Sequence, residues 1–304
     1  MKRCEYLKEG DRIAFAAPAR KIAKDELSPA IRLFESWGLE VVIPEHLYDQ
    51  DGQFAGSDNT RTQLMQELLD DPNIKAIICT RGGYGTVRII DKLDFAKFQE
   101  KPKWIVGYSD ITVLHSHIHQ NFNIETIHGI MPVNIPADAY KQNYPATDSL
   151  KKALFGEGLS YSYTFHSLNR TGKAEGQLVG GNLSILYSLC GSQSGIDTTG
   201  KILFIEDLDE YLYHIDRMLM NLKRNGMFEH LSGLVVGQLS NMHDNTVSFG
   251  KTAEEIVWDS IKEYKFPVCF DFPSGHNGIG NRAMLLGRTV RMEIGNATRL
   301  DWEE

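Results

Sequence analysis

The chain has 304 residues, 42% of them hydrophobic and 24% charged, which is typical of a globular protein and excludes a disordered or fibrous one. Its formal net charge is -8 at pH 7 and no basic run occurs, which argues against nucleic acid because phosphate binding needs concentrated lysine and arginine. Residues 1–11 are rich in charge, and no stretch approaches the roughly 20 apolar residues of a membrane span. We expect a cytoplasmic protein that contacts neither nucleic acid nor a membrane and acts on a small molecule or peptide.

The first part of the chain alternates short apolar runs with amphipathic segments. An apolar run followed by apolar residues at helical spacing predicts a strand and then a helix. The predicted strands are 12–17, 41–44, 75–80, a run that ends at Gly107, and 124–128, and the predicted helices are 25–37, 59–69 and 87–93. This alternation predicts an α/β domain with a doubly wound, mostly parallel sheet that is covered on both faces.

The polar, proline-containing region 132–149 lacks periodicity and is predicted to separate two domains. We expect an N-terminal domain at 1–145, a linker at 146–164 and a C-terminal domain at 165–304. In the C-terminal part the predicted helices are 183–189, 213–225 and 252–262, and the predicted strands are 201–205, 233–237, 267–272 and a final pair between 283 and 294. This pattern indicates a second, smaller domain of mixed α/β type.

Ser109 follows the apolar run that ends at Gly107 and precedes residues at helical spacing. A turn from a strand into a helix lifts a side chain clear of the sheet and places the first N–H groups of the helix beside it, as a nucleophilic serine and its oxyanion require. Serine and aspartate are also common helix N-caps, and for Ser109 taken alone a capping role is the better explanation. The other motifs must therefore decide its role.

A glycine-rich turn, residues 80–85, directly follows the predicted strand at 75–79. Its three glycines permit close approach of a ligand and allow main-chain N–H groups to face an anion. Neither a dinucleotide fingerprint nor a P-loop lysine is present, so an ordinary turn explains the motif equally well.

Glu206 ends a strongly apolar predicted strand and begins an acidic group that also contains Asp207, Asp209 and Glu210. A carboxylate at a strand end can be held half-buried in one orientation, as the partner of a catalytic imidazole must be. A divalent metal site is an alternative, although the group matches no calcium-loop spacing. A solvated acidic helix start is the commoner explanation for Asp207 to Glu210.

His276 lies in a loop rich in glycine after the predicted strand at 267–272, which favours a functional role over packing in a core. His115 and His119, one helical turn apart, are a competing candidate for a metal site. No glutamate completes a metalloprotease pattern, so structural roles fit these two histidines better.

Ser109, Glu206 and His276 each follow a predicted strand, and glycine-rich N–H donors are available nearby. The order serine, glutamate, histidine fits a catalytic triad with an oxyanion hole. The usual G-x-S-x-G elbow is absent because Ile111 stands at the position of its second glycine. This difference weakens an assignment to the α/β-hydrolases specifically.

The motifs around these residues resemble, in order, those of the LD-carboxypeptidase family of serine peptidases. They are Arg-Gly-Gly-Tyr-Gly at 81–85, Gly-Tyr-Ser-Asp at 107–110, Ile-Glu-Asp at 205–207 and Gly-His at 275–276, supported by residues 54–57, 128–129, 131–132 and 180–182. The resemblance runs nearly end to end, without a departure at the catalytic positions. It implies an N-terminal α/β domain that carries the serine and a C-terminal domain that carries the glutamate and the histidine.

The activity that the resemblance implies is that of a muramoyltetrapeptide carboxypeptidase, which removes the terminal D-alanine of murein tetrapeptides during cell-wall recycling in the cytoplasm. Mapped onto this chain, Ser109 is the nucleophile, His276 the general base and then acid, and Glu206 the carboxylate that orients the histidine. Family members commonly form dimers, and the resemblance implies no metal and no organic cofactor.

The resemblance also implies roles for backbone and basic groups near the serine. The N–H groups of Gly83 and Asp110 are the expected oxyanion hole. Arg81 and Arg88 are candidates for binding the carboxylate of the terminal D-alanine.

Two alternatives stay open. A related branch of the family hydrolyses peptidyl-nucleotide antibiotics of the microcin C type and gives self-immunity, and its members tend to carry an added loop in the second domain. The connection 237–252 is short here, which favours the cell-wall branch. A non-catalytic, two-lobed sugar- or peptide-binding protein would keep the cleft but would not need the serine, glutamate and histidine together.

Overall fold

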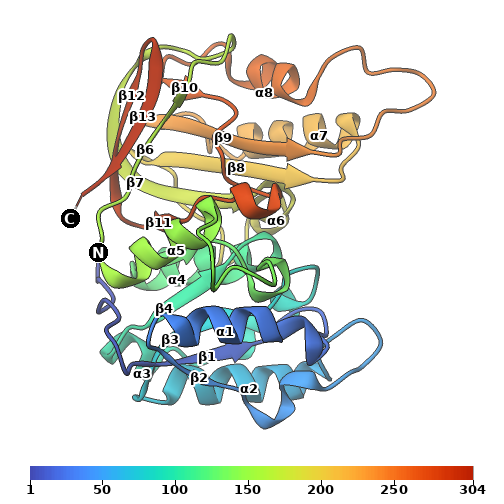
Figure 1. Cartoon of the computed structure of the whole chain (residues 1–304). Helices are drawn as coiled ribbons and strands as arrows, with labels where there is room; N and C mark the ends of the chain where they lie inside the picture. The colour runs from blue at the N-terminus through green and yellow to red at the C-terminus, as the bar shows by residue number, and fades with distance from the viewer. Residues whose placement is uncertain (304) are drawn as a thin grey trace.

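The computed structural model describes residues 1–303 and has two lobes, each built on one β-sheet (Figure 1). The first sheet has six strands in the order β11-β5-β4-β3-β1-β2. These strands are β1 (Arg12–Ala16), β2 (Glu40–Val42), β3 (Ile74–Cys79), β4 (Trp104–Gly107), β5 (Thr126–His128) and β11 (Met284–Leu286). Every neighbouring pair is parallel except β11 with β5, so the predicted mostly parallel sheet is confirmed.

The first four helices of the first lobe connect successive parallel strands, as parallel pairing requires, and the fifth leads from β5 toward the second sheet. They are α1 (Ser28–Ser36), α2 (Asp58–Asp70), α3 (Ala96–Glu100), α4 (Thr112–Phe122) and α5 (Pro145–Phe155). The predicted helix at 87–93 instead forms two 3₁₀ turns, η3 (Thr86–Arg88) and η4 (Ile90–Lys92). Ile89, which lies between the two turns, has φ −115°, a departure from the helical value of about −63° that interrupts the segment.

The second lobe contains a seven-stranded sheet in the order β10-β9-β8-β7-β12-β13-β6. Its strands are β6 (Ser160–Thr164), β7 (Gly172–Asn182), β8 (Ile202–Leu208), β9 (Gly233–Ser240), β10 (Val268–Cys269), β12 (Thr289–Ile294) and β13 (Ala297–Trp302). Strands β7 to β10 run parallel, whereas β12, β13 and β6 pair antiparallel. With α6 (Leu183–Leu189), α7 (Leu212–Arg224) and α8 (Ala253–Ile261), this lobe has the predicted mixed α/β fold.

Two expectations about the chain path are wrong. The segment 146–164, predicted to be a linker, forms most of α5 and all of β6. Pro145 stands in the first turn of α5, where a proline starts a helix instead of marking an irregular segment. The final strands are also not a pair, because β11 joins β5 in the first sheet while β12 joins β7 and β13 in the second. The region 165–304 therefore contributes one strand to the first lobe.

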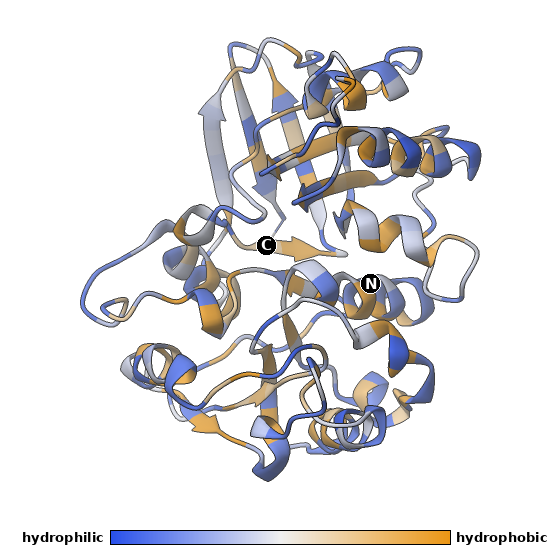
Figure 2. Ribbon diagram, turned by 90° about the vertical axis from the view of Figure 1, so that its right-hand side faces the viewer, coloured by the Kyte–Doolittle hydropathy of each residue, from blue (hydrophilic) through white to orange (hydrophobic). Residues whose placement is uncertain are grey.

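The two lobes meet around α4, which packs on β4 and β5 of the first sheet and on β7 and α6 of the second lobe. At this junction the Asn182 N–H donates to Thr112 Oγ1 at 3.0 Å. A buried ion pair between Arg288 and Glu125 adds a second connection. Hydrophobic residues predominate in the central strands of the second sheet, such as β8 and β9, whereas the helices carry hydrophobic and hydrophilic residues in turn (Figure 2). Within residues 1–303 no helix combines the length and apolarity needed to cross a membrane.

Candidate active site

Ser109 stands at the turn that leads from β4 into α4, through the short 3₁₀ turn η5 (Ser109–Ile111). Its φ is 63°, a left-handed conformation that is uncommon for a residue other than glycine and is found preferentially at functional sites. A Cβ on Gly107 would lie 2.8 Å from Ile111 Cγ1, so glycine at 107 allows this tight turn. Neither η5 nor α4 has a side-chain cap, and the capping explanation for Ser109 is therefore wrong.

The glycine-rich turn lies beside Ser109. A Cβ on Gly82 would be 3.2 Å from Ser109 Oγ and 3.4 Å from the main-chain N of Asp110, so the missing side chain leaves a space that both atoms border. Gly83 follows with φ 110°, a conformation that favours glycine. A substrate carbonyl that entered this space would meet the serine and main-chain N–H groups together, as an oxyanion hole requires.

The side chain of Asp110 holds this turn in place. Its Oδ2 accepts hydrogen bonds from the Thr86 N–H at 2.9 Å and from Thr86 Oγ1 at 2.7 Å. Burial raises the pKa of Asp110, and the two hydrogen bonds from Thr86 oppose that shift. The residue after the serine therefore acts structurally through its side chain, while its main-chain N borders the space beside Ser109.

Glu206 and His276 form a hydrogen-bonded pair in the second lobe. Glu206 lies on β8 with 0% exposure, and its Oε2 accepts from His276 Nδ1 at 2.7 Å. Because a carboxylate can only accept here, the bond assigns the Nδ1–H tautomer and leaves Nε2 available to take a proton. Burial alone would lower the pKa of His276, but the charge and hydrogen bond of Glu206 outweigh it and raise this pKa.

Tyr108 brings the serine turn next to the histidine. Its ring packs edge-on against the His276 imidazole, with 4.9 Å between ring centroids, and its hydroxyl donates to Asn134 Oδ1 at 3.0 Å. Ser109 is the next residue and is half-buried. No hydrogen bond joins Ser109 Oγ to His276 in residues 1–303, and such bonds are commonly long before substrate binds. The fold thus brings the three predicted residues to one region between the lobes.

Asn281 fixes the loop that carries His276, and sequence reasoning missed it. It is fully buried, and its Oδ1 accepts from the Gly275 N–H and from Ser274 Oγ, both at 3.0 Å. Gly275 has φ 130°, and a Cβ there would lie 3.1 Å from Glu206 Oε2. An asparagine in a glycine-rich loop beside a histidine was the available signal, because asparagine side chains commonly bond loop backbone.

Asn281→Ala should lower kcat roughly 10- to 100-fold with little change in KM, because His276 would lose its fixed position while the substrate contacts remain. Asn281→Asp keeps an oxygen at the acceptor position and should recover most of the rate. Steady-state kinetics of the two variants provide the measurement. A full kcat in the alanine variant would show that this bond does not position the histidine.

The acidic group does not behave as one solvated cluster. Asp207 is buried and accepts hydrogen bonds from Asn182 Nδ2 at 3.0 Å, the Ser184 N–H at 2.9 Å and the Leu208 N–H at 2.8 Å. Burial, followed by the charge of Glu206, raises the pKa of Asp207 to about 7. The expectation of a solvated Asp207 is therefore wrong, because this residue anchors the start of α6.

The other two members of the group have partners of their own. Asp209 pairs with His243 at 2.5 Å, and Glu210 pairs with His214 at 2.7 Å. The Asp209–His243 pair lies at the surface, whereas the Glu210–His214 pair is half-buried, and each involves one histidine. Across residues 1–303, no three histidine, cysteine or acidic side chains are grouped as a metal site would need.

The histidines of α4 are structural. His115 is buried and its Nε2 bonds the Gly107 carbonyl at 3.0 Å, which supports the end of β4. Burial lowers the pKa of His115 to about 4, and burial has the same effect on His119. Both rings are neutral near pH 7 and pack inside the lobe junction.

The two arginines predicted to bind a carboxylate are already engaged within the chain. Arg88 bonds both carboxylate oxygens of Asp58, each at 2.9 Å. Arg81 donates to the Lys21 carbonyl at 3.2 Å and lies 3.8 Å from Glu26. A substrate carboxylate would have to displace these partners.

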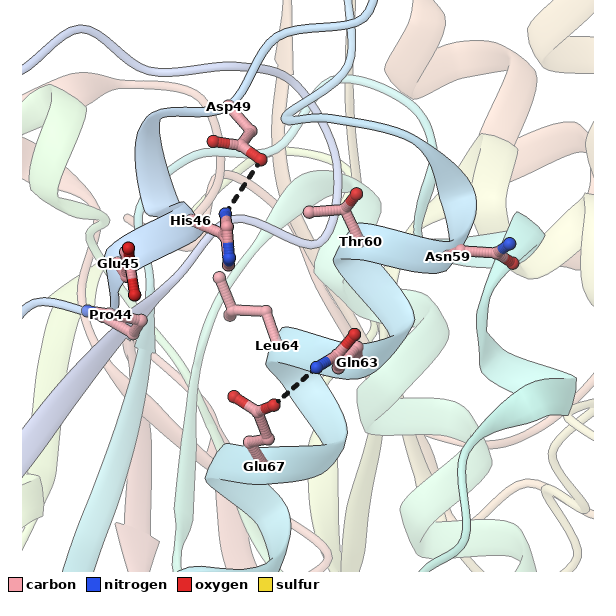
Figure 3. Close-up of a pocket in the computed structure, with 9 residues that line it drawn as sticks. All are labelled: Pro44, Glu45, His46, Asp49, Asn59, Thr60, Gln63, Leu64 and Glu67. Atoms are coloured by element: carbon pink, nitrogen blue, oxygen red, sulfur yellow. Dashed lines mark hydrogen bonds and ion pairs between the residues drawn. The ribbon is translucent and has the colours of Figure 1, made fainter.

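A hollow of about 430 Å³ lies in the first lobe, between η2 (Glu45–Tyr48) and α2 (Figure 3). It is lined by Pro44, Glu45, His46, Asp49, Asn59, Thr60, Gln63, Leu64 and Glu67. Several of these side chains already bond one another, such as His46 with Asp49 and Gln63 with Glu67. The hollow includes none of Ser109, Glu206 and His276, so it is separate from the candidate active site.

Comparison with known proteins now decides the family. A sequence model of the LD-carboxypeptidase N-terminal domain matches residues 13–129, and one of the LD-carboxypeptidase C-terminal domain matches residues 175–292. The chain belongs to the LD-carboxypeptidase family. The first match contains Ser109, and the second contains Glu206 and His276.

Two relatives support this membership over most of the chain. A probable murein peptide carboxypeptidase of Bacillus subtilis is 38% identical over 275 residues, which cover 89% of this chain and 85% of that protein. The murein tetrapeptide carboxypeptidase of Pseudomonas aeruginosa is 30% identical over 301 residues, which cover 96% of this chain and 95% of that protein. The similarity of this LD-carboxypeptidase family member to both is thus nearly full length.

Solved structures agree with the fold. The crystal structure of a muramoyltetrapeptide carboxypeptidase from Oxalobacter formigenes superposes with a TM-score of 0.86 at 27% identity, covering 96% of this chain and 99% of that one. The microcin C7 self-immunity protein MccF, solved with aspartyl sulfamoyl adenosine, has a TM-score of 0.86 at 22% identity. The superposition covers 99% of this chain and 98% of MccF. At that identity the likeness to MccF concerns the fold alone.

Proposed function

We propose that this chain is a serine carboxypeptidase that hydrolyses the L,D bond before the terminal D-alanine of murein tetrapeptides, using Ser109, His276 and Glu206. The observation that carries the proposal is the 2.7 Å bond from His276 to the buried Glu206, next to a serine with a left-handed backbone. Relatives named murein peptide and murein tetrapeptide carboxypeptidases support the substrate.

In this mechanism Ser109 Oγ attacks the scissile carbonyl carbon while His276 Nε2 takes the hydroxyl proton. The resulting oxyanion accepts hydrogen bonds from the N–H groups of Gly83 and Asp110. Glu206 stabilises the imidazolium and keeps it oriented. The C–N bond then breaks, Nε2 passes its proton to the amine of the leaving D-alanine, and water hydrolyses the acyl-enzyme by the reverse proton transfers.

The raised pKa of His276 predicts the acid limb of the pH profile. Only the neutral imidazole can accept a proton, so kcat/KM should fall as the pH drops through this pKa, which lies above the usual 6.5. The midpoint of this fall in kcat/KM should therefore lie at a higher pH than it would for an unperturbed histidine. A pH series of kcat/KM measures it, and a midpoint below 6.5 would contradict the proposed pairing with a charged Glu206.

Mass spectrometry of a purified murein tetrapeptide incubated with the protein tests the activity. Release of D-alanine by the unaltered protein, but not by Ser109→Ala, is expected, and a strong chelator should leave the rate unchanged because the mechanism uses no metal. Hydrolysis only of a peptidyl nucleotide would instead indicate the immunity activity. Binding without hydrolysis of either would indicate a binding protein.

The family resemblance also supports a homodimer that acts in the cytoplasm. Light scattering of the purified protein tests the oligomeric state, and cell fractionation tests the location. A stable monomer would contradict the first statement, and recovery outside the cytoplasm would contradict the second.

A further inference from the structure

Arg20 lies across the glycine-rich turn beside the serine. A Cβ on Gly83 would be 2.5 Å from Arg20 Cδ and 2.8 Å from Arg20 Nε, separations that real Cβ atoms do not adopt. Glycine at 83 therefore leaves the room that the Arg20 side chain occupies. Gly82, the residue before Gly83 in this turn, borders Ser109 Oγ. The Arg20 side chain and Ser109 therefore flank adjacent residues of the same turn.

The backbone of Arg20 is held in place by a short antiparallel pairing. Arg20 is bridged to Phe54, the Lys21 N–H donates to the Gln53 carbonyl at 3.0 Å, and the Ala55 N–H donates to the Ala19 carbonyl at 3.1 Å. The side chain thus extends from an ordered segment toward the serine turn. Such anchoring reduces the ordering cost of using it to bind a ligand.

Arg20 differs from the other arginines of this region in its partners. Among the ion pairs of residues 1–303, Arg81 is joined to Glu26 and Arg88 to Asp58, whereas Arg20 has no carboxylate partner. Its side chain is exposed at the mouth of the site. An exposed guanidinium without a carboxylate partner can bind the carboxylate of a ligand through two parallel hydrogen bonds, and no existing ion pair has to break.

A peptide cut before its last residue must place a carboxylate near the oxyanion hole, because three covalent bonds separate the scissile carbonyl carbon from the terminal carboxyl carbon. We propose that the Arg20 guanidinium binds the C-terminal carboxylate of the substrate and so restricts the enzyme to removing a single terminal residue. This role rests on the proposed function. It assigns the carboxylate to Arg20 in place of Arg81 and Arg88.

The test compares two substrates and two variants. The substrates are a murein tetrapeptide that ends in D-alanine and the same peptide that ends in D-alaninamide, which lacks the terminal charge. The variants are Arg20→Gln and, as a control with the same change of charge on an exposed residue nearby, Lys24→Gln. Release of D-alanine or D-alaninamide gives kcat/KM for each combination.

Arg20→Gln should lower kcat/KM for the peptide that ends in D-alanine roughly 10- to 100-fold. For the peptide that ends in D-alaninamide, kcat/KM should stay within about threefold of the parent value, since only the terminal carboxylate loses charged hydrogen bonds. Lys24→Gln should leave both unchanged. An equal loss on both substrates, or no loss on the acid, would overturn the role of Arg20 while the carboxypeptidase activity stands. Failure of the unaltered protein to release D-alanine would overturn the proposed function and this role with it.

Discussion

Ser109→Ala is expected to lower kcat on the order of 10⁴- to 10⁶-fold, and His276→Ala is expected to do the same. The physical reason is that the nucleophile and its base act as one unit, so that loss of either removes the covalent route. The double variant should be only slightly slower than each single variant. Single-turnover release of D-alanine from a murein tetrapeptide provides the measurement.

The two variants should differ in stability. Ser109 Oγ makes no cap, so Ser109→Ala should change the free energy of unfolding by about 0.5 kcal/mol, whereas His276→Ala leaves the buried Glu206 without its partner and should lower it by about 1–3 kcal/mol while the protein stays folded. Chemical denaturation checks this and excludes unfolding as the cause of lost activity. Losses that multiply in the double variant would mean that the two residues act independently and that the triad assignment is wrong.

Glu206→Gln should reduce turnover by roughly 10³- to 10⁴-fold while keeping the shape of the site. The amide can donate as well as accept, so it can hold the imidazole in the tautomer that cannot take the serine proton. It also removes the charge that raises the pKa of His276, so the acid limb of kcat/KM should move to lower pH. A pH series on the variant measures both effects.

Glu210→Gln is the matched control, because it makes the same chemical change four residues along the chain. Glu210 forms a half-buried bond with His214 and does not contact His276, so its substitution should lower turnover by less than about tenfold. Asp207 is not a suitable control, because it is buried and holds the start of α6. If Glu210→Gln proved as damaging as Glu206→Gln, the acidic group would act collectively and Glu206 would not be the specific partner of the histidine.

The amino-acid sequence by itself determined the order of strands and helices in most of the chain and the position of the main candidate residues. Apolar runs are local features, and β4 and β8 follow directly from them. Polar residues that follow such runs are recognisable in the same way, which is why Ser109 and Glu206 could be proposed before the fold was known. His276 was proposed from its glycine-rich loop, and the motifs of the LD-carboxypeptidase family then assigned roles to the three residues with a specificity that periodicity does not have.

Only the tertiary structure decided the features that depend on segments far apart in the chain. Strand β11 crosses back to pair with β5, and Asp207 is buried because Asn182 and Ser184 approach it from β7 and α6. Arg20 meets the glycine-rich turn because its backbone pairs with Phe54, more than 30 residues away. Spacing along the chain reports which face of one element a residue occupies, but burial and partners are set by the surfaces that pack against that face. The chemical environment of the site was therefore decided by the packing of the two lobes.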